Sequence, residues 1–416
     1  MKRYSFFSLA RNAVNYHKDW GLAWRSPEPR PEYDVVIIGA GGHGLATAYY
    51  LAAEHKVTNV AVIEKGWLGG GNTGRNTTII RSNYLQDESV AIYELARSLY
   101  EGLSKELNFN IMFSPRGLLM LCQTEHELRA MKRTAHANRL AGIEARMIDR
   151  AEVKTLVPII NDRDDCRYPI LGAYYQPRGG TARHDAVAWG YARGADARGV
   201  DIVQNCAVTG IMRDGGRVTG VETTRGTIRA RKVAVVAAGH TSVIMDMAGV
   251  RMPIESVCLQ ALVSEPIKPV LDVVVMANTV HGYISQSDKG ELVIGGGSDP
   301  YNNYSQRGSF PAIEHTVTAL VETFPIISRL RMMRHWGGIV DMPGDRSPII
   351  SRTDVDGLFV NCGWGTGGFK SIPGSGFVFA DTIANDRPHP FAAPFGLNRF
   401  IEGRLIDESV AAAVAH

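Results

Sequence analysis

A glycine-rich turn between two short apolar segments, near the start of the chain, constrains the fold more than any other feature. Residues 33–44 read Tyr-Asp-Val-Val-Ile-Ile-Gly-Ala-Gly-Gly-His-Gly, and residues 59–65 read Asn-Val-Ala-Val-Ile-Glu-Lys. This pattern predicts a strand, a tight turn, a helix and a second strand. Gly39 permits the turn, Gly41 lets the backbone approach a pyrophosphate, and Gly44 lets the helix pack closely on the strand. The helix N-terminus offers free N–H groups and partial positive charge to phosphates.

The second predicted strand is followed by an acidic residue, Glu64, 20 residues after Gly44. At this spacing a carboxylate accepts both hydroxyls of an adenosine ribose. A purely structural glycine turn is the alternative, but the flanking strands and the acid favour an ADP site, without separating FAD from NAD. We also assign Gly42, His43 and Lys65 to this site, and for His43 we expect the backbone N–H to matter more than the ring.

The composition is that of an ordinary globular protein with room for two domains. The chain has 416 residues, 45% hydrophobic and 21% charged, and a net charge of +3. This balance gives no reason to expect a nucleic acid or a membrane as partner, and no apolar run approaches the length of a bilayer crossing. The five cysteines form no C-x-x-C, and no secretory signal or metal-ligand spacing stands out. We therefore expect a cytoplasmic protein with reduced thiols and no metal.

Periodicity gives a coarse secondary structure for the rest of the chain. We expect helices at 45–53, 91–107 and 125–140, with a strand at 117–122 between the last two. Residues 207–230 alternate as an antiparallel meander with a Gly-Gly turn, and they lead into a continuous apolar strand at 232–239, typical of a parallel sheet. Residues 250–335 alternate strand-like segments with one helical run near 311–330.

Near the C-terminus, residues 357–370 predict a strand that opens onto a glycine loop, and a helix follows residues 373–376. The nucleotide domain is thus expected to be assembled from separated stretches, with a second domain inserted between them. Residues 1–32, which carry Trp20, Trp24 and a proline cluster, predict an arm packed on this subunit or on a partner.

The motifs resemble the D-amino-acid-oxidase family of flavoenzymes. The fingerprint, the meander ending in Val-Ala-Ala-Gly at 236–239 and the C-terminal glycine loop carry this resemblance. Further segments resemble, within it, the beta subunits of heterotetrameric sarcosine oxidases; they are Thr-Thr-Ile-Ile-Arg at 77–81, Tyr-Gln-Pro at 175–177, Arg-His-Asp at 183–185, Gln-Asn-Cys at 204–206, Trp-Gly-Gly-Ile-Val-Asp at 336–341 and Cys-Gly-Trp-Gly-Thr-Gly-Gly-Phe-Lys at 362–370. The similarity covers nearly the whole chain from about residue 20.

The resemblance implies an α/β fold: a Rossmann-like FAD-binding domain of the glutathione-reductase type with an inserted α+β substrate domain of the D-amino-acid-oxidase type. We expect the FAD-binding domain at 33–90, 150–245 and 335–395, the substrate domain at 91–149 and 246–334, and a C-terminal tail at 396–416. The further FAD contacts that we expect are Asn72, Thr73, Asn76, Val208, Gly365, Gly368 and Lys370, whereas His240 and His335 are expected to be structural.

Arg81 and Lys370 follow two glycine loops that should converge on the flavin. Two cations at one pocket suit a carboxylate, which Arg binds bidentately; two solvated surface cations are the alternative. In the family, the matching positions hold the carboxylate of the amino acid substrate. The resemblance therefore implies that Arg81 and Lys370 are the catalytic substrate-binding pair.

His184 stands just before a helical run, where a histidine is usually a capping residue. In the family, the matching histidine carries a covalently attached FMN, so the resemblance implies a second flavin here, with Arg183 beside it. Some relatives have lysine where this chain has Arg183, which keeps the charge but does not readily give up a proton.

Two absences are also informative. Monomeric relatives attach FAD through a cysteine, but residues 336–351 contain none; we therefore expect FAD to be held non-covalently. Those relatives also place an oxygen-activating lysine over the flavin, in a strand that resembles residues 291–295. Here the inward positions look apolar, and we expect that FAD does not reduce oxygen directly.

The expected activity is oxidative demethylation of sarcosine to glycine and a one-carbon unit, released as formaldehyde or passed to tetrahydrofolate. Electrons would pass from FAD to FMN and then to oxygen, giving hydrogen peroxide. The resemblance implies alpha, gamma and delta subunits as partners, with NAD and tetrahydrofolate on a partner. One alternative is a related enzyme that oxidises an opine, proline or a D-amino acid; another is a flavoprotein without catalytic function, which would not need Arg81 and Lys370.

Overall fold

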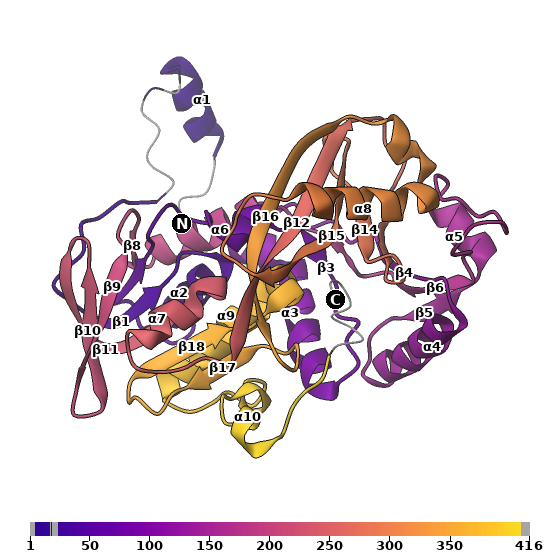
Figure 1. Cartoon of the computed structure of the whole chain (residues 1–416). Helices are drawn as coiled ribbons and strands as arrows, with labels where there is room; N and C mark the ends of the chain where they lie inside the picture. The colour runs from indigo at the N-terminus through magenta and orange to yellow at the C-terminus, as the bar shows by residue number, and fades with distance from the viewer. Residues whose placement is uncertain (1–4, 17, 19–23, 409–416) are drawn as a thin grey trace.

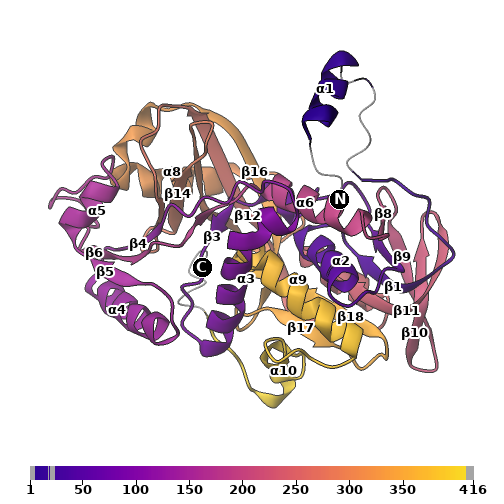
Figure 2. The ribbon, with the colours of Figure 1, turned by 180° about the vertical axis from the view of Figure 1, so that it is seen from behind.

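The computed structural model describes residues 5–16, 18 and 24–408, and two eight-stranded sheets occupy the two halves of the molecule (Figure 1). Helix α1 (Phe6–Val14) stands apart from both halves in Figures 1 and 2 and buries none of its residues. Of the predicted arm, Trp20 lies outside the described residues, and Trp24 packs against the main hydrophobic core. Among the described residues, no helix has the length and apolar character needed to cross a bilayer.

The first sheet contains the predicted nucleotide-binding unit. Its strand order is β17 (Ile349–Arg352), β18 (Leu358–Cys362), β11 (Gly226–Val235), β1 (Glu32–Ile38), β2 (Val60–Ile63) and β8 (Asp201–Val203), with β10 (Arg217–Thr223) and β9 (Val208–Asp214) joined beside β11. The strands β18, β11, β1, β2 and β8 are mutually parallel. The segments 226–230 and 232–239, predicted as separate strands, contribute to one strand, β11, whose first half pairs with the meander and whose second half pairs with β18.

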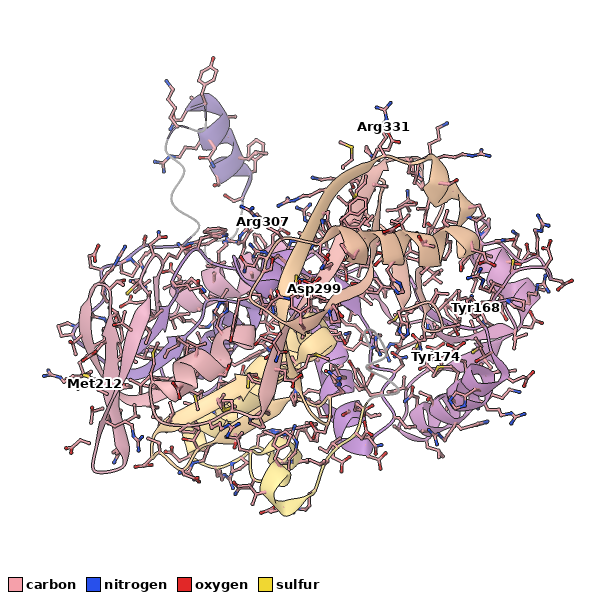
Figure 3. All side chains as sticks on the ribbon, in the orientation of Figure 1. Tyr168, Tyr174, Met212, Asp299, Arg307 and Arg331 are labelled. Carbon is pink, nitrogen blue, oxygen red and sulfur yellow. The ribbon has the colours of Figure 1, made fainter. Side chains whose placement is uncertain are left out.

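Both faces of the first sheet are covered, which explains why its central strands are continuous apolar runs. Side chains alternate along β1, so Val35 and Ile37 face one core while Val36 and Ile38 face another. Helices α2 (Gly42–Ala53), α6 (His184–Asp196) and α9 (Gly368–Asn385) lie over the first face (Figure 2). Helix α7 (Thr241–Asp246) covers the other, beside the meander that holds Met212 at one end of the molecule (Figure 3).

The second sheet is mainly antiparallel, and helices pack against it. Its order is β16 (Met332–Pro343), β12 (Ile254–Pro266), β15 (Glu291–Asn302), β14 (Gly282–Gln286), β13 (Val274–Ala277), β4 (Leu118–Cys122), β6 (Gly172–Gln176) and β5 (Arg146–Ile148). The helices around it are α4 (Glu125–Leu140), α5 (Arg150–Leu156) and α8 (Phe310–Thr323). Arg331, at the start of β16, marks the tip of this half, and Tyr168 lies near α5 and α4 (Figure 3).

Strand and helix contacts outside the two large sheets complete the fold. Strand β3 (Ile79–Ile80) pairs with β7 (Gly180–Thr181), and α3 (Asp87–Glu106) packs against α9. Strands β6 and β16 belong to the second sheet, whereas the predicted segments 150–245 and 335–395 assigned them to the FAD-binding domain. The difference arises because strand pairing, unlike strand formation, depends on residues distant in the sequence. Helix α10 (Arg399–Glu402) lies in the segment predicted as a tail.

The prediction that the last long helix follows residues 373–376 is wrong, because α9 already begins at Gly368 and contains Pro373. A proline inside a helix lacks the N–H that would bond the carbonyl four residues earlier. Here that carbonyl belongs to Phe369, and the hydroxyl of Tyr100 donates to it at 2.7 Å. Helix α3 thus supplies the hydrogen bond that Pro373 cannot, and the helix continues.

Replacement of Gly44 by alanine tests the close packing of α2 on β1. A Cβ there would lie 2.0 Å from the carbonyl oxygen of Gly39. We expect Gly44→Ala to lower the free energy of unfolding by about 2–3 kcal/mol, since the helix must move off the strand. Urea denaturation measures the change.

The matched control is Gly102→Ala in α3, where no atom lies within 4 Å of the added Cβ. We expect it to be neutral or stabilising by up to about 1 kcal/mol. Equal destabilisation by the two substitutions would contradict the proposed steric cause.

Candidate functional site

A cavity of about 720 Å³ opens at the carboxyl ends of the parallel strands of the first sheet. These ends are the place where open α/β sheets bind ligands. The residues that end or follow β1, β2, β11 and β18 line one side, and residues of β12, β14 and β16 close the other. The cavity therefore lies between the two halves of the molecule.

Most of the predicted FAD-binding residues line this cavity. They are Gly39, Gly41, Gly42, His43, Glu64, Lys65, Asn72, Thr73, Asn76, Val208, Gly365, Gly368 and Lys370. Gly44 is not among the lining residues, in keeping with its predicted packing role. Arg81 lines the same cavity. The structure thus brings together residues from six separate parts of the sequence.

The glycine turn leaves the start of α2 open to the cavity. Gly39 has a φ of +113°, which a residue with a side chain rarely adopts. Helix α2 has Gly41 as its N-cap and receives no side-chain cap there. The backbone N–H of Gly42 donates to the hydroxyl of Thr73 at 2.9 Å, so the second glycine loop is attached to this helix N-terminus. An anion at this end would meet backbone N–H groups and the positive end of the helix dipole.

Glu64 is fixed by the backbone around it. One carboxylate oxygen accepts the N–H of Ala40 at 3.0 Å, and the other accepts the N–H of Gly66 at 2.9 Å. Each oxygen keeps further acceptor capacity, as recognition of ribose hydroxyls requires. The neighbouring Lys65 lies 3.2 Å from the imidazole Nε2 of His240, whose pKa is lowered by burial and by that lysine.

The second glycine loop is organised by its own amide side chains. Asn72 donates to the carbonyl of Ile339 on β16, and Asn76 donates to the carbonyl of Thr73. The amide oxygen of Asn76 also accepts the N–H of Thr78 at 2.7 Å. Thr78 has a φ of +68°, a strained conformation for a β-branched residue. Strain of this kind is found at ligand sites, where surrounding contacts hold it.

Arg81 and Lys370 both line the cavity, and both are buried. The two residues are 2% and 5% exposed. The Arg81 guanidinium donates to Asn83 at 2.8 Å and lies 4.9 Å from the centre of the Tyr84 ring. The Lys370 ammonium donates to the carbonyl of Thr366 at 2.8 Å. Burial lowers the pKa of Lys370 well below its ordinary value, and the charge of Arg81 lowers it further.

The ring of His43, which sequence reasoning set aside, belongs to a hydrogen-bonded network. Its Nδ1 lies 2.7 Å from the hydroxyl of Ser375, which also accepts the amide N–H of Asn361 at 2.7 Å. The indole of Trp364 donates to Asn361 at 2.7 Å and stacks on His43 with the ring centres 5.1 Å apart. This network joins α2 to the C-terminal glycine loop. Asn361 and Trp364 lie within or beside the motif at 362–370, but that motif did not indicate their contacts.

Asp341 was also missed as a site residue, although it ends the motif at 336–341. It lines the cavity and accepts the backbone N–H of Gly363. Burial raises its pKa to about 6, and N–H groups of Gly363, Gly365 and Trp364 oppose that rise. Its carboxylate therefore holds the first turn of the loop that leads to Lys370.

His184 and Arg183 do not line this cavity. His184 is the first residue of α6, and burial lowers its pKa. Its Nδ1 is buried and has no hydrogen-bond partner among the residues that the structure describes. Arg183 is paired with Asp185 through two hydrogen bonds of 2.9 and 2.7 Å. Among the described residues, no three histidine, cysteine or acidic side chains group as metal ligands.

Comparisons with known proteins agree with the fold and identify the family. Residues 34–382 match the model of the family described as FAD dependent oxidoreductase. The chain is 68% identical to sarcosine oxidase subunit beta from Rhodobacter capsulatus over the whole of both chains. It is 58% identical to the subunit of the same name from an Arthrobacter species, over 94% of this chain and 97% of that protein. L-proline dehydrogenase from P. horikoshii has the same fold, with a TM-score of 0.85, 24% identity and coverage of 91% and 100%.

The buried ring of His43 predicts a pH dependence of stability. Burial lowers its pKa from 6.5 to about 4, so the unfolded chain takes up the proton first as the pH falls. The neutral ring therefore contributes stability that is fully present above pH 6.5 and is lost towards pH 4, by at most about 3 kcal/mol.

We expect His43→Gln to remove this part of the acid sensitivity, as measured by urea denaturation at several pH values between 4 and 7.5. His126→Gln, on the exposed side of α4, is the control and should leave the acid profile unchanged. An identical profile for the wild-type protein and the His43 variant would rule the assignment out.

Proposed function

This chain belongs to the D-amino-acid-oxidase type of FAD-dependent oxidoreductases, in the group of sarcosine oxidase beta subunits, and we propose that it oxidises sarcosine at Arg81 and Lys370. The products would be glycine and a one-carbon unit, as formaldehyde or on tetrahydrofolate. The observation that carries the proposal is the placement of two buried cations in one cavity beside the nucleotide-binding turn.

The charges of the pair support a carboxylate ligand. Two like charges in a buried cavity repel each other, and the lowered pKa of Lys370 reflects this repulsion together with burial. A carboxylate between them would offset the repulsion and favour the charged form of Lys370. The planar guanidinium of Arg81 would hold the carboxylate in one orientation and thereby fix the position of the substrate nitrogen and methyl group.

The residues of the cavity fit FAD. The turn at Gly39 and Gly41, the N-terminus of α2 and the carboxylate of Glu64 match a pyrophosphate and a ribose in their usual order. We propose non-covalent binding, since residues 336–351 contain no cysteine. When bound, FAD supplies the acceptor for the electrons of the C–N bond, and FMN supplies their onward route to oxygen, giving hydrogen peroxide.

We further propose His184 as the attachment point of a covalent FMN. The support is its buried Nδ1, which lacks a hydrogen-bond partner, and its position outside the FAD cavity. Arg183 would provide positive charge beside the flavin. The alpha, gamma and delta partner subunits would complete the enzyme and would carry NAD and tetrahydrofolate.

Substitution of the cation pair tests the substrate assignment. Arg81→Ala should lower kcat/KM for sarcosine by about 100-fold or more, because it removes a charge-assisted bidentate contact. The kcat/KM of Arg81→Lys should fall between those of the wild-type protein and Arg81→Ala, since lysine keeps the charge but lacks the planar guanidinium. Steady-state kinetics with sarcosine, L-proline and glycine measures both the loss and the substrate preference.

The control for this series is Arg139→Ala, on the exposed side of α4, which should keep wild-type kinetics. Unchanged turnover of sarcosine in Arg81→Ala, or faster turnover of L-proline than of sarcosine by the wild-type protein, would refute the assignment.

The proposed FMN link gives a separate prediction. The denatured and washed wild-type subunit should keep a yellow flavin and show a mass increase equal to one FMN. His184→Ala should be colourless after the same treatment and have the mass of the polypeptide alone, whereas His126→Ala should behave as wild type. Mass spectrometry decides the matter, and flavin that survives denaturation of His184→Ala would place the link elsewhere.

A further inference from the structure

The segment 404–408, here called the C-terminal strap, runs from α10 to the start of α3. It is anchored on Asp345, which forms a buried ion pair with Arg399 at 2.8 Å. The backbone N–H of Ile406 donates to the same carboxylate at 3.3 Å, and the hydroxyl of Ser347 donates to the carbonyl of Ile406 at 2.7 Å. These contacts fix the direction in which the strap leaves its anchor.

The C-terminal strap places the carboxylate of Glu408 at the N-terminus of α3. Glu408 is 2% exposed. Its two oxygens accept the N–H groups of Gln86 at 2.9 Å and Leu85 at 3.5 Å. Helix α3 has no side-chain cap of its own at Gln86. A residue 322 positions away in the sequence therefore supplies the cap and a negative charge at the positive end of the helix dipole.

The capped segment is the one that carries Arg81. Residues 81–86 connect β3 to α3, and Arg81 and Tyr84 are both buried. The Tyr84 ring lies against the Arg81 guanidinium and stacks on Tyr93 with the ring centres 3.7 Å apart. A shift at Leu85 and Gln86 would be transmitted through Tyr84 to the guanidinium, because the buried packing leaves little free space.

Glu408 also acts on Arg81 through its charge. Burial raises the pKa of Glu408, and the positive charge of Arg81 is among the influences that oppose the rise. The charge of Arg81 also acts on Lys370, whose pKa it lowers in addition to the effect of burial. The carboxylate of Glu408 partly offsets the positive charge of Arg81 without occupying the cavity, since Glu408 is not a lining residue.

We propose that Glu408 is a positioning residue for substrate binding: the C-terminal strap fixes the segment 81–86 and so aims the Arg81 guanidinium at the substrate carboxylate. This inference rests on the proposed role of Arg81. It assigns a function to a segment whose sequence predicts only a tail.

The test compares Glu408→Ala, Glu408→Gln and a matched control in the FAD-loaded holoenzyme. Glutamine keeps an acceptor for the N–H of Gln86 but loses the charge. The control is Glu402→Ala, whose carboxylate pairs with Arg404 at the partly exposed end of α10. Rates are expressed per bound FAD, so that loss of folded protein does not enter them. The dissociation constant of 2-methoxyacetate, a carboxylate without an oxidisable nitrogen, is read from the flavin absorption spectrum.

For Glu408→Ala we expect KM for sarcosine and the dissociation constant of 2-methoxyacetate to rise about tenfold, while kcat stays within about threefold of wild type. Glu408→Gln should recover part of the affinity, and Glu402→Ala should match wild type. A cap with a purely structural role would lower the midpoint of unfolding but leave both constants per bound FAD unchanged, and that result would overturn the inference.

If Glu408→Ala yields no folded protein, Glu408→Gln decides: a rise in both constants of at least about threefold supports the inference, and wild-type values reject it. Arg81→Ala is measured in parallel to separate this inference from the proposed function. Wild-type affinity in Arg81→Ala would reject the proposed carboxylate site itself. Lost affinity in Arg81→Ala together with wild-type constants in Glu408→Ala would reject only the role of the strap.

Discussion

The burial of two cations in one cavity is the constraint on which the proposed substrate half of the site depends. An ion removed from water loses several kcal/mol of hydration, and a second ion of the same sign adds repulsion. The fold compensates with fixed dipoles and with one carboxylate held just outside the cavity: Asn83 and the carbonyl of Thr366 accept from the two cations, and Glu408 lies near Arg81. The repulsion that remains between the two cations favours an anionic group as their ligand.

The same constraint explains why many contacts around the two cations join residues that are distant in the sequence. The segment after β3 and the start of α9 lie far apart in sequence, and aromatic residues hold them together. Tyr93 stacks on Tyr84, and a Cβ at Gly367 would lie 2.0 Å from the Tyr93 hydroxyl, so the two loops are in direct contact. Tyr100 lies about two helical turns after Tyr93 in α3. Its hydroxyl donates to the carbonyl of Phe369, which allows α9 to start early enough to place Lys370 in its first turn.

These distances in sequence decide what could be predicted. The strand, turn and helix at 32–53 follow from local propensity and steric limits, and the sequence predicted them and the cavity residues they contribute. The start of α9 was misplaced because Pro373 breaks a helix unless a distant hydroxyl compensates. The contacts of His43 and Asp341 were missed because their partners are also distant in the sequence. No local sequence pattern around a histidine or an aspartate in a glycine-rich stretch identifies such a partner. The convergence of Arg81 and Lys370 was predicted only through a resemblance.

The two halves of the site therefore differ in how they encode function. The nucleotide half uses backbone N–H groups, glycines and one carboxylate, a set that binds an ADP moiety whatever reaction the protein carries out. The substrate half uses side chains from segments around residues 81, 341, 370 and 408, each fixed by contacts with another. Substitution in this half can alter which substrate is held without altering the nucleotide contacts, because the two halves share few residues. Lys370 is the exception, since it ends the C-terminal glycine loop, lines the cavity and interacts with the charge of Arg81. A change at that residue should therefore perturb both halves, which makes the loop at 363–370 the part of the chain with least freedom to vary.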